Sequence, residues 1–177
     1  MDLEKKRDEY LSDEQLLTTM RGKAVFIRWG DISGFNNLDD IFGPVNVVFV
    51  LYEYKPYVGH WIALLKNGKG CDYEFFDSMA SMPDEYLPKY NYIDNKRKPL
   101  LGRLIMKEIK RGKKVEYNSI QLQSKDDGVS TCGRWCLVRA ITKNWLTVDQ
   151  FDILFYELSK KYNISTDDLI TKITKEL

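Results

Sequence analysis

Residues 58–77 have the sequence VGHWIALLKNGKGCDYEFFD, which decides how the middle of the chain folds. Residues 60–66 form an apolar run typical of a buried strand, and residues 71–77 are rich in the aromatic side chains that strands favour. Between them, residues 67–70 contain two glycines and an asparagine, which is the composition of a tight turn. This segment is therefore predicted to be a β-hairpin.

The register of the hairpin brings together two residues that can do chemistry. If Lys66 faces Cys71 across the turn, His60 faces Asp77 at the open end. Directly opposed residues share one face of a sheet, with Cβ atoms about 4.5–5.5 Å apart. A carboxylate in that position holds an imidazole in one tautomer, as a general base requires. We therefore expect His60, the only histidine of the chain, to be paired with Asp77.

The rest of the pattern predicts an α+β fold, in which a central mixed sheet is flanked by helices. With 177 residues, 44% of them apolar, the chain has the size of a single domain spanning residues 1–177. Capping boxes at Ser12 and Thr147 and caps at Ser165 and at Ser130 or Thr131 indicate helix starts. Strands are predicted at residues 24–28, 46–53 and 115–121, and helices at residues 37–42, 100–110, 132–141, 147–160 and from 165 onward.

Composition argues against several classes of protein. The 27 basic and 26 acidic residues give a formal net charge of +1, so no global charge attracts nucleic acid or anionic membranes. The charged N-terminus lacks the apolar core of a signal peptide, and no apolar run reaches the roughly 20 residues of a membrane-spanning helix. Three cysteines and one histidine give no zinc-type spacing. We therefore expect a soluble cytosolic protein with reduced thiols, no metal, no other cofactor and no membrane partner.

Cys132 is the candidate nucleophile because of its position in a predicted helix. It would lie in the first turn, where the unpaired N–H groups of the helix favour a thiolate. Cys136, one turn further on, would point deeper into the core and act as a small apolar residue, but it remains the alternative. Cys71 lies in a strand and is most simply a packing residue. Upstream of Cys132, residues 120–129 are predicted to be a strand that ends in a polar loop, from which a glutamine amide could stabilise an oxyanion.

Four motifs together resemble a known family. They are Gly59-His60-Trp61, Phe75-Phe76-Asp77-Ser78, Gln123-Ser124 and Thr131-Cys132-Gly133. The combination resembles the adenovirus protease (adenain) and ubiquitin-like-protein protease superfamily of cysteine peptidases, and is most similar to members from large DNA viruses and virophages. The resemblance implies the adenain fold and a papain-like site in circularly permuted order. By this resemblance, the chain would use His60 as general base, Asp77 as orienting partner, Gln123 as oxyanion donor and Cys132 as nucleophile.

Two positions leave alternatives open. Gln123 lies nine positions before Cys132, a longer spacing than the family usually has, so a longer loop is needed and Gln121 remains a second candidate donor. The resemblance places Trp61 and Gly133 in the substrate cleft. However, Trp61 lies on the opposite face of a regular strand from His60, so core packing also explains it.

The resemblance also implies a function. It indicates an endopeptidase that cleaves after glycine in small-residue motifs and processes viral capsid or core precursor polypeptides at the assembly site in the host cytoplasm and in the virion. DNA or a peptide would be an activator, with the basic residues 96–98 and 107–114 as candidate DNA contacts or, alternatively, as a solvated helix end. Two alternatives are a deubiquitinase or ubiquitin-like-protein isopeptidase, and a catalytically idle binding domain of the same fold. Thr131, where ubiquitin-like proteases commonly have an acidic residue, favours the viral branch.

Overall fold

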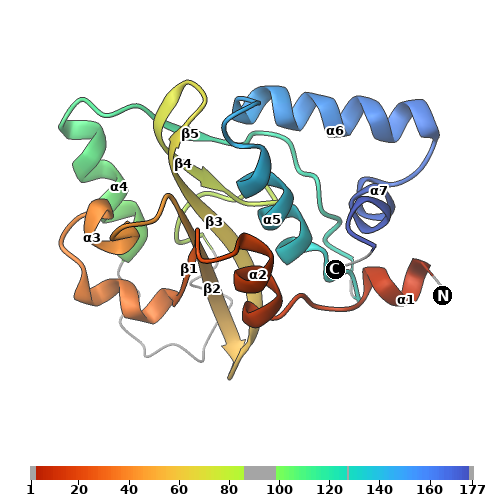
Figure 1. The fold of residues 1–177 in the computed structure, drawn as a ribbon, viewed down its shortest axis with the longest axis horizontal. Coiled ribbons are helices and arrows are strands. Elements are labelled where there is room, and N and C mark those ends of the chain that lie inside the picture. Colours follow the sequence, from red (N-terminus) through yellow and green to blue (C-terminus); the bar gives the residue numbers. More distant parts are fainter. Residues whose placement is uncertain (1–2, 86–98, 127, 176–177) are drawn as a thin grey trace.

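A mixed five-stranded sheet forms the centre of the computed structural model, which describes residues 3–85, 99–126 and 128–175 (Figure 1). The inner strands β2, β3 and β4 form an antiparallel meander, and the edge strands β1 and β5 run parallel to their neighbours. The α+β class and the mixed sheet are as predicted. In sheet order, the strands are β1 (Val25–Arg28), β2 (Val47–Lys55), β3 (Val58–Gly68), β4 (Cys71–Phe76) and β5 (Val115–Tyr117).

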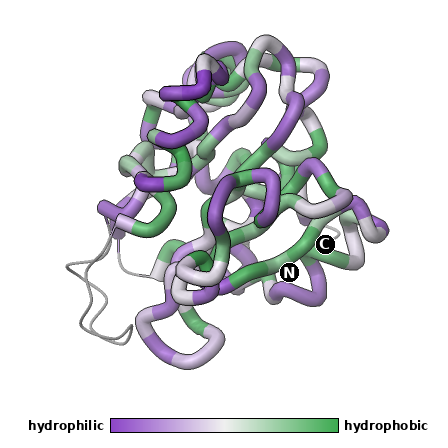
Figure 2. The backbone as a smooth tube through the Cα atoms, turned by 90° about the vertical axis from the view of Figure 1, so that its left-hand side faces the viewer, coloured by the Kyte–Doolittle hydropathy of each residue, from purple (hydrophilic) through white to green (hydrophobic). Residues whose placement is uncertain are grey.

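Helices cover both faces of this sheet because the inner strands bury side chains on both sides. Val47, Phe49 and Leu51 of β2 belong to one apolar core, and the alternating residues Val48 and Val50 belong to the other. Along the helices, hydrophilic and hydrophobic residues alternate (Figure 2), as expected for helices with one buried side. The first core packs against α2 (Asp13–Met20), α5 (Cys132–Thr142), α6 (Val148–Tyr162) and α7 (Thr166–Ile173).

The second core lies under three elements on the other face. They are the 3₁₀ helix η1 (Trp29–Gly34) and the helices α3 (Leu38–Phe42) and α4 (Leu100–Lys110). At the N-terminus, α1 (Leu3–Arg7) packs against α7, which brings the two ends of the chain together (Figure 1). Within the described segments, the helices are all too short or too polar to cross a membrane.

The central hairpin forms, but its predicted register is wrong by two residues. Lys66 pairs with Tyr73 rather than with Cys71, and Cys71 pairs with Gly68, so the loop contains only residues 69 and 70. Two-residue loops are the commonest hairpin connection, and Gly70 supplies the positive φ of 86° that this tight turn needs. A shift of two residues leaves every side chain on its predicted face of the sheet. His60 therefore lies diagonally across from Asp77 instead of directly opposite it.

Most predicted helix starts are confirmed. Ser12 and Thr147 form capping boxes, and the Ser165 side chain caps α7. Thr131 precedes α5 but does not cap it with its side chain; its hydroxyl donates a hydrogen bond to Asp167 instead. Because the Thr131 hydroxyl does not cap α5, it can link the residue before Cys132 to Asp167 on α7.

The last strand is shorter than predicted. It ends at Tyr117 instead of residue 121, because the N–H groups of Ser119 and Ile120 donate to Oδ2 of Asp152 on α6 rather than to a neighbouring strand. The predicted strand within residues 120–129 is likewise absent from the described residues of that segment. The chain between β5 and α5 is therefore a loop that side chains hold in place.

A buried ion pair joins α5 to the sheet. Arg139 of α5 donates from Nε and Nη2 to the two carboxylate oxygens of Glu74 on β4, at 2.6 Å each, and both side chains are fully buried. Such a two-pronged pair fixes the rotation of a helix as well as its distance from the sheet. The pair thus sets the position of the helix whose first residue is Cys132.

The glycine before His60 allows two strands to approach closely. A Cβ atom at Gly59 would overlap the carbonyl oxygen of Tyr52 and lie 2.7 Å from its carbonyl carbon, and neither backbone atom can move aside. We expect Gly59→Ala to lower the free energy of unfolding by about 3 kcal/mol, the upper range for overpacking. Gly30→Ala is the matched control, since Gly30 has no neighbour within 4 Å of the new atom, and should change it by less than about 0.5 kcal/mol. Equal effects of the two variants in urea denaturation would contradict this explanation.

Candidate active site

The end of the hairpin and the start of α5 bring a histidine, a carboxylate and a thiol together. His60 lies on β3, Asp77 directly follows β4, and Cys132 is the first residue of α5. Nε2 of His60 is 2.8 Å from Oδ1 of Asp77, and the imidazole is also hydrogen-bonded to the Cys132 side chain. Because Asp77 engages Nε2, Nδ1 is the ring nitrogen left to exchange a proton with the thiol. This is the arrangement of a base that is oriented on one side and acts on the other.

The electrostatics of the site favour a charged imidazole. Burial by itself would lower the pKa of His60, which is only 4% exposed. The Asp77 carboxylate and then Cys132 outweigh that effect and raise the pKa from 6.5 to about 10. His60 therefore carries its proton at neutral pH.

A glutamine amide approaches the same region from the loop before α5. Gln123 is 2% exposed, and its Oε1 accepts a 2.7 Å hydrogen bond from Oγ of Ser78, the residue after Asp77. Its Nε2 donates to the carbonyl oxygen of Val129 at 3.2 Å, which uses one of the two amide hydrogens. The second hydrogen is the one that a reacting oxyanion could take.

Gln121, the alternative donor, has a different environment. Its side chain is exposed, and its Nε2 donates to the carbonyl oxygen of Gln123 at 2.8 Å. Gln121 therefore supports the backbone of Gln123, while the buried amide is that of Gln123.

Sequence reasoning missed the residues that hold Asp77. The Asn118 side chain accepts from the N–H of Asp77 at 2.8 Å and donates to its carbonyl oxygen at 2.6 Å. The Asp77 carboxylate also accepts from the N–H of Met79 at 2.9 Å. These bonds fix the backbone and the side chain of Asp77 separately. No short motif could have identified Asn118, because it is 41 positions away in the chain.

Asp167 of α7 links the loop that carries the glutamine to the residue before the cysteine. One oxygen of this buried carboxylate accepts from the Thr131 hydroxyl, and the other accepts from the N–H of Ser124 at 2.8 Å. Thr131 directly precedes Cys132, and Ser124 directly follows Gln123. A single side chain thus sets the separation of the two segments, and the long spacing between Gln123 and Cys132 is compatible with their approach.

This link predicts a positioning role for Asp167. We expect Asp167→Asn, which removes one acceptor charge and keeps the shape, to lower kcat for any Cys132-dependent reaction by about 10- to 100-fold with little change in KM. Asp168→Asn is the matched control, because Asp168 is the neighbouring residue and lies 3.9 Å from Arg7 in a partly exposed ion pair. It should retain activity within about twofold. A rise in KM with kcat unchanged, or an equal loss of kcat in both variants, would contradict a positioning role for Asp167.

The other two cysteines lie where packing was predicted. Cys136 is fully buried, its Sγ contacts the carbonyl oxygen of Trp61 at 3.4 Å, and burial raises its pKa well above the usual value. Burial also raises the pKa of Cys71, on β4. Neither environment favours a thiolate at neutral pH.

Trp61 and Gly133 lie beside the site under the N-terminal segment. The indole of Trp61 is buried in the first core, and its Nε1 donates to the carbonyl oxygen of Leu11 at 3.1 Å. A Cβ atom at Gly133 would lie 3.1 Å from Cβ of Leu11 and 3.3 Å from Cδ1 of Trp61, so glycine permits this close packing. Trp61 packs in the core and at the same time lines a pocket of about 230 Å³ together with Gly59, Leu11 and Tyr57. Core packing of Trp61 is thus confirmed, whereas neither His60 nor Cys132 lines this pocket, so a substrate cleft at Trp61 stays a prediction.

The basic segment at the end of α4 is largely engaged in local contacts. The Lys107 ammonium group donates to the backbone carbonyl oxygen of Asn36. Three further basic residues form ion pairs with nearby carboxylates: Arg111 with Glu108, Lys113 with Asp72, and Lys114 with Glu116. The proposed partners in a DNA-binding patch, residues 96–98, lie outside the described residues. Within the described part of the chain, no three histidine, cysteine or acidic side chains are grouped to hold a metal ion.

The raised pKa of His60 predicts how stability depends on pH. A pKa of about 10, above the 6.5 of the unfolded chain, means that the native state keeps a proton that the unfolded state releases. This contribution to stability is fully present below pH 6.5 and is lost as pH rises toward 10. We expect wild type to lose more stability than His60→Gln over that interval. Since the chain has one histidine, NMR can follow its imidazole without assignment, and a midpoint near 6.5 would contradict the ion pair.

One comparison with known proteins relates the chain to a protein of a virophage. No protein-family profile matches it. Over 168 residues it is 31% identical to the uncharacterized protein V9 of Sputnik virophage, and the alignment covers 93% of each protein. Similarity of that extent over nearly the full length of both proteins indicates common ancestry and a common fold. The chain therefore belongs to the same protein family as the Sputnik virophage protein V9.

Proposed function

We propose that this protein is a cysteine endopeptidase of the adenain and ubiquitin-like-protein protease superfamily. In this proposal, the Cys132 thiolate attacks a peptide carbonyl, while His60, oriented by Asp77, holds the proton and then gives it to the leaving amine. Gln123 Nε2 and the Cys132 N–H stabilise the oxyanion. Water then cleaves the thioester with His60 as the base. The acyl group leaves as a free acid, and the thiolate is restored.

The observation that carries the proposal is the convergence of four residue types from separate parts of the chain. His60 contacts both Asp77 and Cys132, and Ser78, next to Asp77, holds the amide of Gln123. Each contact alone has a structural explanation. Together, a buried imidazole, a thiol at a helix start and a fixed amide supply the acid and base, the nucleophile and the oxyanion donor that acyl transfer needs.

The covered position of these groups supports a preference for glycine at the cleaved bond. Cys132 is 4% exposed, and the neighbouring Trp61 and Leu11 are buried as well. A substrate must pass these side chains to reach the thiol, and a residue without a side chain does so with the least displacement. We therefore propose cleavage after glycine within small-residue motifs.

The virophage relative supports a viral setting for this activity. Because the related protein V9 belongs to Sputnik virophage, we propose that the substrates are viral capsid or core precursor polypeptides. The activity would then operate at the assembly site in the host cytoplasm and in the virion.

The proposal is tested by release of a fluorophore from two substrates. One is a short peptide of small residues with glycine at the cleaved bond, and the other is a ubiquitin-like C-terminal conjugate. We expect wild type to cleave the peptide, and cleavage should require Cys132. Preference for the conjugate would instead make the protein an isopeptidase. No turnover of either substrate, with and without added DNA, would indicate a catalytically idle domain and overturn the proposal.

A further inference from the structure

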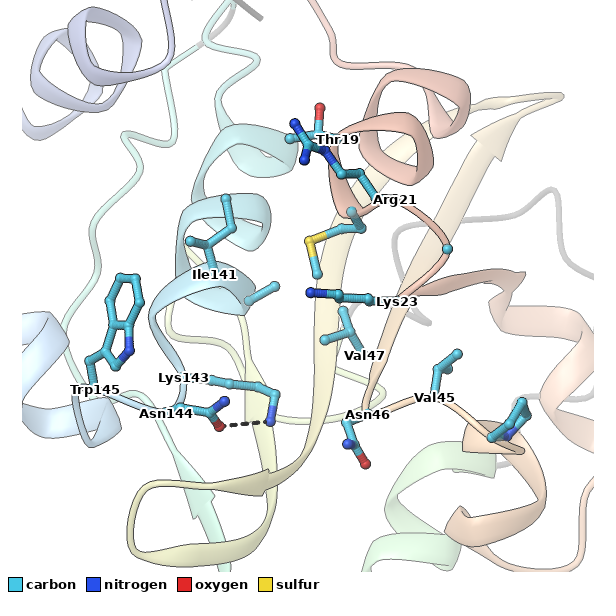
Figure 3. Close-up of a pocket in the computed structure, with 14 residues that line it drawn as sticks. Thr19, Arg21, Lys23, Val45, Asn46, Val47, Ile141, Lys143, Asn144 and Trp145 are labelled. Atoms are coloured by element: carbon cyan, nitrogen blue, oxygen red, sulfur yellow. Dashed lines mark hydrogen bonds between the residues drawn. The ribbon is translucent and has the colours of Figure 1, made fainter.

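A cavity of about 510 Å³ opens at the far end of α5 from Cys132, between α2 and the start of β2 (Figure 3). This volume is within the roughly 300–1,000 Å³ of ligand pockets. Its walls come from the turn after α2, from the residues that lead into β2, and from the last turn of α5 with the residues that follow it. None of the residues of the candidate active site lines it, so an occupant would not contact Cys132.

The cavity is positively charged although the chain is nearly neutral. Arg21, Lys23 and Lys143 line it, and among its described lining residues there is no aspartate or glutamate. Figure 3 shows Arg21 and Lys23 on the α2 side and Lys143 on the α5 side. Arg21 and Lys23 are exposed, and within the described residues neither has an acidic side chain within ion-pair distance. Their charges are therefore available to an anionic ligand.

Lys143 places a third positive charge in the cavity wall. Burial of this ammonium group costs free energy of desolvation, which an anion would offset. Lys143 is 7% exposed, and burial lowers its pKa. Its ammonium group donates to the carbonyl oxygens of Lys66 and Asn67 and to Oδ1 of Asn144, all neutral acceptors. Among the described residues no carboxylate lies within ion-pair distance of Lys143, and Glu74 acts on its charge only from further away. An additional anion would therefore stabilise this buried cation.

The rest of the lining is apolar. Met20, Val47 and Ala140 form a buried floor, while Ile141 and Trp145 are 46% and 67% exposed. An exposed tryptophan beside an aliphatic floor is typical of a surface that binds a side chain of a partner. The ligand should thus combine an apolar group with negative charge.

The backbone of the cavity argues for carboxylates held by side chains rather than for a phosphate nest. The N–H groups of Arg21, Lys23 and Val45 already donate to the carbonyl oxygens of Thr18, Met20 and Phe42, at 3.0–3.1 Å. Phosphate sites usually present several unpaired backbone N–H groups. We therefore propose that this cavity binds an acidic peptide segment of a partner protein, with one apolar side chain on the floor and neighbouring carboxylates at Arg21 and Lys23.

Selection from a random peptide library on the immobilised full-length protein tests this assignment. We expect the enriched peptides to carry an apolar residue next to aspartate or glutamate. Binding of the strongest peptide should change the fluorescence of Trp145, which is exposed, whereas Trp29, Trp61 and Trp135 are buried. The double variant Arg21→Glu with Lys23→Glu should bind it at least tenfold more weakly.

The matched control carries the same charge change elsewhere. Lys110→Glu with Lys172→Glu alters two exposed lysines on α4 and α7, outside the cavity lining, and should bind within twofold of wild type. The assignment is overturned if no peptide is enriched, if enriched peptides lack acidic residues, or if both double variants bind equally. It is also overturned if a single-stranded oligonucleotide changes Trp145 fluorescence at lower concentration than the peptide does. These readouts need no catalysis, so they are independent of the proposed peptidase.

Discussion

Cys132→Ala is expected to abolish peptide cleavage, with a loss of at least about 10⁴-fold in kcat/KM, the size seen when an enzyme loses its nucleophile. The thiol contacts the imidazole that Asp77 orients, and no other thiol in the described residues lies at the start of a helix. The variant should fold, because removing a sulfur next to a charged imidazole leaves the core hydrocarbon contacts intact. Initial rates with the glycine peptide, measured beside thermal unfolding of the same sample, separate lost chemistry from lost structure.

Cys136→Ala is the control for this experiment. Cys136 lies one helical turn from Cys132 on α5 and is fully buried, so its replacement leaves a small void. We expect about 1 kcal/mol of lost stability and activity within about threefold of wild type. If Cys136→Ala loses turnover in a folded protein while Cys132→Ala keeps it, the nucleophile has been assigned to the wrong residue.

Gln123→Ala is expected to lower kcat by about 10²- to 10³-fold with little effect on KM, as for other single oxyanion donors. An oxyanion exists only in the transition state and the intermediate, so the lost hydrogen bond affects the chemical step more than substrate binding. The substitution also leaves the buried Ser78 hydroxyl and the Val129 carbonyl without this partner. Single-turnover acylation rates at a temperature where both proteins are folded measure the chemical effect directly.

Gln121→Ala provides the comparison that distinguishes the two glutamines. Its exposed side chain bonds only to the carbonyl oxygen of Gln123 among its described partners, so we expect acylation within about fivefold of wild type. A larger loss in Gln121→Ala than in Gln123→Ala would make residue 121 the oxyanion donor and overturn the assignment.

The pairing of His60 with Asp77 could be predicted even though the hairpin register was wrong. Alternation along a strand has a period of two, so an error of two residues keeps both side chains on their faces. The exact register depends on the turn, and glycines at both 68 and 70 made two turns compatible with the sequence. The structure uses the shorter one, with Gly70 at positive φ.

The contacts that hold the site together could not be predicted in the same way. Asn118, Asp152 and Asp167 each bind backbone or side-chain groups more than 30 positions away in the chain. Local patterns report which residues form helices and strands, but not which buried polar side chain bonds to which distant N–H group. Thr131 shows the consequence. It looks like a helix cap in sequence, yet its hydroxyl donates to Asp167 on α7.

The most direct test of the proposed peptidase is mass spectrometry of the full-length protein after reaction with a peptide that ends in a glycine vinyl sulfone. The proposal predicts one adduct per molecule, located on Cys132, and a rate that falls sharply in His60→Gln. Adducts on Cys71 or Cys136, or a rate on Cys132 that does not depend on His60, would contradict a His60-activated Cys132 nucleophile.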